Sequence, residues 1–245
     1  VRGAIALFLC APGLVAAPRV SAAQGAAHVA AEVTAPDTTV VRDLPLIENP
    51  SPRPGRVLAV FLTGDGGWAM LDRSIARVLA DSGISVVGFD SHAYLGRRRT
   101  PDETARDVAR AARHYLAQWH RDRLLIVGYS RGADLAPFVA TRLPADLHAS
   151  LAGVAMLGLG HSASFEFPLL DFVRDVERPG DPLILPELQR LRGTPMLCVF
   201  GTDEQRSACR DADAALIARY SRDGGHHFIG DYKAIGGLIA ATFTK

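Results

Sequence analysis

The sequence predicts one α/β domain in which a mostly parallel central sheet carries helices on both faces. Short runs rich in Val, Ile, Leu and Phe recur from residue 56 onward, and segments with apolar residues at helical spacing separate them. Parallel strands have this composition because helices bury both of their faces. A chain of 245 residues, 48% of them hydrophobic and 22% charged, can also build a substantial core.

Strands and helices alternate along the chain in this prediction. The expected strands are residues 57–62, 85–89, 124–127, 153–157 and 196–200, and the expected helices are residues 71–81 and 102–119. The second helix has a clear start signal, since Thr100 can cap it, Pro101 suits its first position and Glu103 completes a capping box. Open parallel sheets bind ligands beyond the carboxyl ends of their strands, so the segments after each strand hold the candidate site residues.

The first residues have the pattern of a secretory signal peptide. Arg2 precedes an apolar run over residues 4–17 that is too short to span a bilayer, and Ser21, Ala22 and Ala23 offer small residues for cleavage. We therefore expect a signal peptide at residues 1–23 and a loosely structured extension at residues 24–54, with an edge strand at residues 38–42. Residues 55–245 are expected to form the α/β domain.

Two cysteines remain after such a leader. Export would place Cys198 and Cys209 in an oxidising compartment, where a pair so close in sequence can form a disulfide. The alternative is one buried strand thiol and one separate loop thiol. No zinc-binding spacing surrounds either residue, and we expect neither a metal nor a cofactor.

Residues 124–134 have the pattern of a nucleophile elbow. A buried strand leads into Gly128-Tyr129-Ser130-Arg131-Gly132, and a helical pattern follows, which is the context that Gly-x-Ser-x-Gly requires. The glycines permit a sharp turn that raises the Ser130 hydroxyl above the sheet, at the positive end of the next helix. This predicts an α/β-hydrolase fold with Ser130 as its nucleophile.

A serine nucleophile needs a histidine base and a carboxylate that orients it, and in this fold the acid precedes the histidine. The loop after residues 196–200 offers Asp203 and Glu204. Glu204 occupies the acid position of the common Gly-x-x-Asp pattern, whereas Asp203 lies one residue earlier but is of the shorter and commoner type. His226 and His227 are the candidate bases, and the first histidine of such a loop usually faces the site. We place Glu204 before Asp203 and His226 before His227, and both choices stay open.

The segment after the first strong strand, Gly64-Asp65-Gly66-Gly67, fits an oxyanion hole. Its glycines let the backbone approach a substrate, so we expect the amides of Asp65 and Arg131 to stabilise the oxyanion. Alternatively the glycines form only a tight turn or a phosphate cradle, but no Lys-Ser or Lys-Thr pair of a Walker loop follows.

Further residues near the expected site could contact a substrate. The candidates are Gly66, Trp68, Asp134 and Glu166. Trp68 could line a pocket or pack on the first helix. The carboxylates of Asp134 and Glu166 could bind an ammonium group. Alternatively, Asp134 could stabilise a helix N-terminus, and Glu166 could be a surface acid.

Several motifs occur together from about Arg56 to the C-terminus. They are residues 63–68, Thr100-Pro101, residues 128–138, Phe165-Glu166, residues 198–201 and residues 225–228. In this combination and order the chain resembles the bacterial virulence protein VirJ/AcvB family. It departs from the family pattern at Arg131, where an aromatic residue is expected, and at Arg206, where an acid is common.

The resemblance implies a periplasmic, virulence-linked serine hydrolase that cleaves the aminoacyl ester of lysyl-phosphatidylglycerol. It implies an aminoacylated phospholipid or another small ester as the substrate, and it allows peripheral membrane contact and contacts with secretion-system proteins. Arg97, Arg98 and Arg99 could bind a lipid phosphate or form a solvated loop. A formal net charge of +1 gives no overall field that would favour nucleic acid, which we do not expect as a partner.

Two alternatives to this hydrolase remain. The first is a periplasmic binding or assembly factor for secreted virulence substrates, which would use the pocket without chemistry. The second is an esterase of another specificity.

Overall fold

The computed structural model describes residues 41–166 and 180–244. Within them lies a seven-stranded sheet of order β1-β3-β2-β4-β5-β6-β7. Strand β1 pairs antiparallel with β3, and all other neighbouring strands are parallel. The strands are β1 Leu46–Asn49, β2 Val57–Leu62, β3 Ser85–Phe89, β4 Arg123–Tyr129, β5 Leu151–Leu157, β6 Met196–Gly201 and β7 Ala218–Arg222. The predicted fold class is confirmed.

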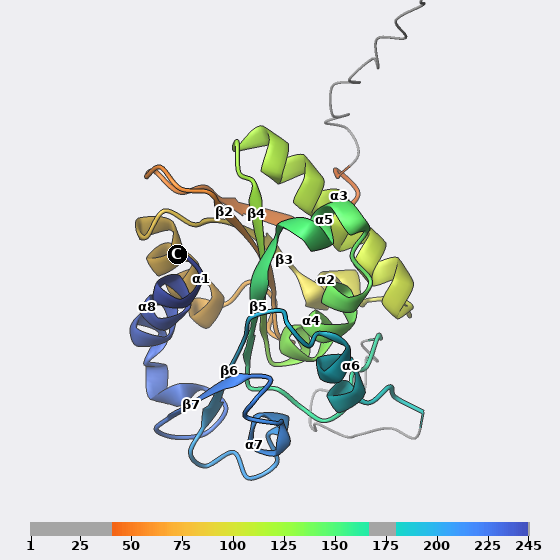
Figure 1. The fold of residues 1–245 in the computed structure, drawn as a ribbon, viewed down its shortest axis with the longest axis vertical. Coiled ribbons are helices and arrows are strands. Elements are labelled where there is room, and N and C mark those ends of the chain that lie inside the picture. The colour runs from red at the N-terminus through yellow and green to blue at the C-terminus, as the bar shows by residue number, and fades with distance from the viewer. Residues whose placement is uncertain (1–40, 167–179, 245) are drawn as a thin grey trace, which may run out of the picture. The chain divides into compact units, whose positions relative to one another are not determined.

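Helices connect these strands and cover both faces of the sheet (Figure 1). They are α1 Met70–Asp81, α2 Ser91–Tyr94, α3 Pro101–Gln118, α4 Arg131–Thr141, α5 Ala145–Ser150, α6 Ile184–Arg190, α7 Ala208–Asp211 and α8 Tyr232–Phe243, with a 3₁₀ turn at Phe228–Gly230. The start of α3 is as predicted, because the Thr100 hydroxyl accepts from the Glu103 amide and the Glu103 carboxylate accepts from the Thr100 amide.

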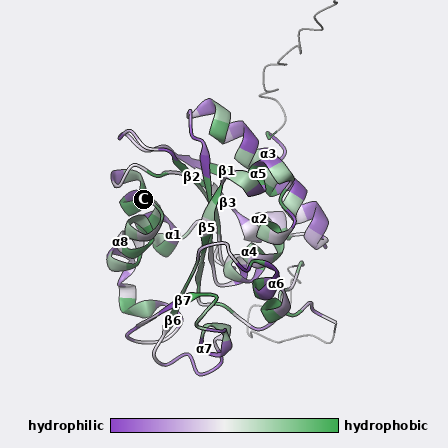
Figure 2. Ribbon diagram, viewed as in Figure 1, coloured by the Kyte–Doolittle hydropathy of each residue, from purple (hydrophilic) through white to green (hydrophobic). Residues whose placement is uncertain are grey.

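The core consists of two apolar layers, one on each side of the sheet. Helices α1 and α8 bury Leu71, Ile75 and Ile239 against one face. Helices α3, α4 and α6 cover the other, with residues such as Val108 and Phe138. The inner strands β2 to β6 are mostly hydrophobic, whereas hydrophobic and hydrophilic residues alternate along α3 (Figure 2). Burial on both faces explains why β2 and β3 have the predicted bounds.

The N-terminal edge of the sheet differs from the expectation. Residues 41–43 form a turn, and the edge strand is β1, whose Leu46 lies opposite Phe89 of β3. The strand prediction at residues 38–42 is therefore wrong in its described part, and the predicted loose extension contains a paired strand. Pairing with the buried β3 supplies the hydrogen bonds that local sequence did not indicate. The predicted signal peptide lies outside the described residues.

Candidate active site

Ser130 lies in the sharp turn between β4 and α4. Its backbone has a φ of 54° and a ψ of −122°, which is a strained conformation for any residue with a side chain. A hydrogen bond of 2.8 Å from its amide to the Leu157 carbonyl oxygen holds it beside β5. The turn requires both elbow glycines, because a Cβ at Gly128 would lie 2.2 Å from the Gly132 oxygen and one at Gly132 would lie 2.0 Å from the Leu62 oxygen. The backbone is thus that of a nucleophile elbow.

Glu204 and His226 form a hydrogen-bonded pair at the carboxyl end of the sheet, where the elbow also lies. The His226 Nδ1 lies 2.5 Å from Glu204 Oε1, and the Gly201 amide donates to Oε2 at 2.5 Å. Burial alone would raise the Glu204 pKa, but the hydrogen bonds from His226 and Gly201 outweigh it and hold that pKa below its usual value. The ionised carboxylate only accepts hydrogen bonds, so neutral His226 carries its proton on Nδ1 and keeps Nε2 as its basic nitrogen.

The His226 ring lies close to the elbow. It sits over Gly158, where an added Cβ would be 2.5 Å from the ring Cε1, and its centroid is 5.3 Å from that of the Tyr129 ring. Gly158 follows Leu157, the residue that accepts from the Ser130 amide. The carboxyl ends of β4, β5, β6 and β7 therefore bring Ser130, Gly158, Glu204 and His226 together.

The other acid and histidine candidates point elsewhere. The exposed Asp203 accepts a hydrogen bond of 3.4 Å from the neighbouring Thr202 hydroxyl. His227 is also exposed, and its Nδ1 lies 2.9 Å from the Tyr129 hydroxyl. Of the candidates, the structure thus pairs Glu204 with His226, whereas Tyr129 fixes the orientation of His227.

A disulfide closes the loop that carries Glu204. Cys198 of β6 and Cys209 of α7 are bonded, with their Cα atoms 5.7 Å apart, so this prediction is confirmed. Arg210 adds to the closure, since its Nε donates to the Glu204 carbonyl oxygen at 2.8 Å and its Nη2 donates to that of Thr202 at 2.7 Å. Arg210 could not be predicted from the sequence, because a guanidinium that binds backbone carbonyls leaves no motif.

The predicted oxyanion loop packs directly on the elbow. A Cβ at Gly64 would lie 3.2 Å from the Ser130 Cβ, and the Arg131 guanidinium forms an ion pair with the Asp65 carboxylate. Gly66 is exposed, and the nearest atom to an added Cβ there is 3.9 Å away. The structure therefore brings the loop of Asp65 and Gly66 to the elbow, as an oxyanion hole requires.

The structure gives contacts of Trp68 and Asp134, two of the remaining substrate-binding candidates. Trp68 packs edge-on against Phe61, with ring centroids 5.9 Å apart, and lies over Gly88, so it covers β2 and β3. The Asp134 carboxylate accepts from the Gly160 amide at 2.7 Å and thereby fixes the segment after β5. Glu166 is partly buried in that segment. Contact of these three side chains with a substrate stays a prediction.

Asp72 caps the N-terminus of α1, just after the oxyanion loop, with a buried carboxylate. It is 1% exposed, and its Oδ2 accepts from the Ala69 amide at 3.0 Å. Burial is the main cause that raises the Asp72 pKa from 3.8 to about 6.

The raised Asp72 pKa predicts a pH-dependent stability. The protonated carboxyl of Asp72 favours the folded state. This stabilisation is complete below the pKa that Asp72 has in the unfolded chain, and it is lost as pH rises through the pKa that Asp72 has in the folded protein. At about 1.4 kcal/mol per pKa unit, the free energy of unfolding should fall by about 2 kcal/mol relative to Asp72→Asn between pH 4 and 7.5. Urea unfolding of both proteins measures this difference, and identical pH slopes would contradict it.

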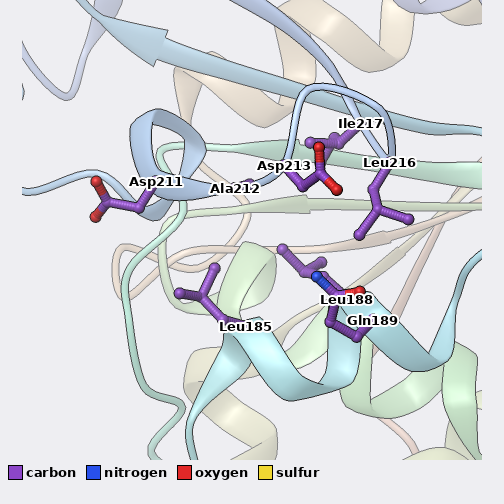
Figure 3. Close-up of a pocket in the computed structure, with 8 residues that line it drawn as sticks. All are labelled: Leu185, Leu188, Gln189, Asp211, Ala212, Asp213, Leu216 and Ile217. Atoms are coloured by element: carbon purple, nitrogen blue, oxygen red, sulfur yellow. The ribbon is translucent and has the colours of Figure 1, made fainter.

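A separate cavity of about 150 Å³ lies between α6 and residues 211–217 (Figure 3). Leu185, Leu188, Leu216 and Ile217 line it, and Asp211 and Asp213 lie at its border; none of the site residues named above contributes to it. In the described part of the chain, no cluster of three or more His, Cys, Asp or Glu side chains could bind a metal. No helix among the described residues is long and apolar enough to cross a membrane.

Solved structures with this fold include several enzymes. The esterase domain of a Rhodothermus marinus protein is 20% identical with a TM-score of 0.54, over 80% of this chain and 89% of that one. MenH from S. aureus is 13% identical with a TM-score of 0.57, over 80% and 97%. A thermostable carboxyl esterase from Bacillus coagulans is 11% identical with a TM-score of 0.55, over 81% and 94%. At these identities the likeness concerns the fold.

The sequence also matches a protein family. No curated protein matches the chain. The model of the bacterial virulence protein (VirJ) family, however, matches residues 56–245, which include the elbow, the acid loop and the histidine loop. The chain therefore belongs to the VirJ family and has the α/β-hydrolase fold.

Proposed function

We propose that this chain is a serine hydrolase that cleaves esters with Ser130, His226 and Glu204. The hydrogen-bonded Glu204–His226 pair at the edge where the strained elbow presents Ser130 carries this proposal. His226 Nε2 takes the Ser130 proton while Oγ attacks the ester carbonyl, and the amides of Asp65 and Arg131 stabilise the oxyanion. His226⁺ then protonates the departing alcohol, and water activated by His226 releases the acyl group. Ionised Glu204 stabilises the imidazolium during both steps.

The proposed substrate is the aminoacyl ester of lysyl-phosphatidylglycerol, acted on in the periplasm. Family membership supports it, together with the charges beside the site. The Arg99 amide donates to the Phe165 carbonyl at 2.8 Å, so the basic residues 97–99 lie beside the segment that carries Glu166. Guanidinium groups there would bind the lipid phosphate, and Glu166 would attract the lysyl ammonium groups.

Lipid hydrolysis tests this function. The mature protein, Ser130→Ala and a control variant are incubated with lysyl-, alanyl- and unmodified phosphatidylglycerol, and released amino acid is measured. Ser74→Ala is a suitable control, because the Ser74 hydroxyl bonds the Met70 carbonyl within α1, away from the site. We expect lysine release by the wild type and Ser74→Ala, and a loss of at least about 10³-fold in Ser130→Ala.

The other outcomes identify the alternatives. A preference for alanyl lipid, or hydrolysis of simple esters alone, would indicate an esterase of another specificity. A wild type that releases nothing and does not react with a fluorophosphonate probe would contradict the hydrolase and favour the binding factor.

We further propose that residues 1–23 direct export to the periplasm. Alkaline phosphatase, which is active only after export, should be active in the periplasm when fused behind these residues. Replacing residues 8 and 9 of the apolar run with Asp should abolish that activity. Equal activity of both fusions would contradict the proposal.

A further inference from the structure

An ion pair joins the two loops that the proposed oxyanion hole uses. Asp65 follows β2 and Arg131 begins α4; Arg131 Nε donates to Asp65 Oδ1, and Nη2 donates to Oδ2 at 3.1 Å. Only 16% of the Arg131 side chain and 40% of the Asp65 side chain are exposed. A two-point guanidinium–carboxylate contact fixes orientation as well as distance, and partial burial reduces its screening by water.

The backbones of these loops touch, so a small shift of either loop changes the geometry of the hole. A Cβ at Gly132 would meet the Leu62 oxygen at 2.0 Å and the Thr63 oxygen at 2.7 Å. The strands beneath are direct neighbours, with Leu62 opposite Gly128. The spacing of the Asp65 and Arg131 amides therefore depends on how firmly one loop is held to the other.

We propose that the Arg131 side chain is a positioning residue for the oxyanion hole. Through Asp65 it holds the loop after β2 at the distance from the elbow that the two amides need to stabilise the tetrahedral intermediate together. This inference rests on the proposed hydrolase function. It gives a physical role to the elbow position where the sequence departs from the expected aromatic residue.

The chain provides a matched control pair at the opposite end of the same strands. Arg56 precedes β2 and Asp122 precedes β4, and Arg56 Nε and Nη2 donate to Oδ1 and Oδ2 at 2.9 and 2.6 Å. Both pairs span 66 residues of sequence. The control pair is far more exposed, at 71% and 59%. Arg56→Gln therefore removes the same kind of link between β2 and β4 at the end of the strands that lies away from the proposed active site.

Steady-state hydrolysis of p-nitrophenyl acetate tests the positioning role. We expect Arg131→Gln and Asp65→Asn each to lower kcat by about 10- to 100-fold with little change in KM, since small misplacements of catalytic groups have effects of this size. The double variant should be no worse than either single variant, because both remove one interaction. Arg131→Lys keeps the positive charge but not the two-point contact, so its kcat should lie between those of Arg131→Gln and the wild type. Arg56→Gln should match the wild type.

Three results would overturn the positioning role. The first is an unchanged kcat in Arg131→Gln and Asp65→Asn, and the second is an equal loss in Arg56→Gln. The third is a lower kcat in Arg131→Gln with a higher one in Asp65→Asn, which would mean that the charge of Arg131 alone acts on the oxyanion. If the wild type neither hydrolyses the ester nor reacts with fluorophosphonate, the proposed function itself fails. Normal wild-type reactivity with unaffected variants rejects the positioning role alone.

Discussion

Replacing His226 with alanine should lower kcat for ester hydrolysis by at least about 10³-fold, whereas His227→Ala should retain activity within about tenfold. The two residues are adjacent in sequence and both contact the elbow, but their contacts differ in kind. His226 meets the Glu204 carboxylate through Nδ1 at 2.5 Å, and His227 meets the Tyr129 hydroxyl through Nδ1 at 2.9 Å. Of these two partners, the negatively charged carboxylate stabilises the imidazolium that forms as Ser130 loses its proton far better than a neutral hydroxyl does.

Each variant serves as the control for the other. Both remove one imidazole from the same loop, and both remove a contact with the Tyr129 ring, so a general disturbance of the loop would affect them equally. The measurements are kcat and KM for p-nitrophenyl acetate and the rate of fluorophosphonate labelling of Ser130. Equal losses in the two variants, or a larger loss in His227→Ala, would reject His226 as the base.

The sequence predicted the elements whose residues are buried on both faces and missed those defined by pairing alone. Strands β2 and β3 are continuous apolar runs, and their predicted bounds match the structure. Strand β7, Ala-Arg-Tyr-Ser-Arg, is almost wholly exposed at the edge of the sheet and has no apolar period. Its pairing with β6 comes from the tertiary fold, and no local pattern encodes that pairing.

The candidate site shows the same division. The elbow and the order of acid and histidine follow from local motifs, because the glycines, the serine and the strand are contiguous. The choice between Asp203 and Glu204 depends on the Gly201 amide, which donates to the Glu204 carboxylate and turns it toward His226. The Arg131–Asp65 pair joins positions 66 residues apart and depends on β2 and β4 being neighbours. The Gly-x-x-acid spacing of Gly201 and Glu204 is a local signal for the first contact, whereas a single sequence contains no signal for the second.

Gly158→Ala should lower kcat by about 10²-fold or more without removing any catalytic group. The added methyl would lie 2.5 Å from Cε1 and 2.8 Å from Nδ1 of the His226 ring, closer than atoms can approach. Either the ring leaves its place between Glu204 and the elbow, or the β5 loop shifts. Misplacement of a catalytic base by about 1 Å has an effect of this size. KM for a small ester should change little, since the loss concerns the reacting geometry.

Gly193→Ala separates this effect from backbone strain. Gly158 has a φ of 67° and Gly193 one of 93°, so alanine is strained at both positions, at about 1 kcal/mol or more of stability. No atom of the described residues lies within 4 Å of an added Cβ at Gly193, and the residue follows α6 outside the site. We expect Gly193→Ala to lower the urea midpoint through strain alone and Gly158→Ala to lower it at least as much, but normal kcat and labelling in Gly193→Ala only. Full activity of Gly158→Ala would mean that catalysis does not require the His226 ring where the structure places it, which would remove the geometric basis of the proposed mechanism.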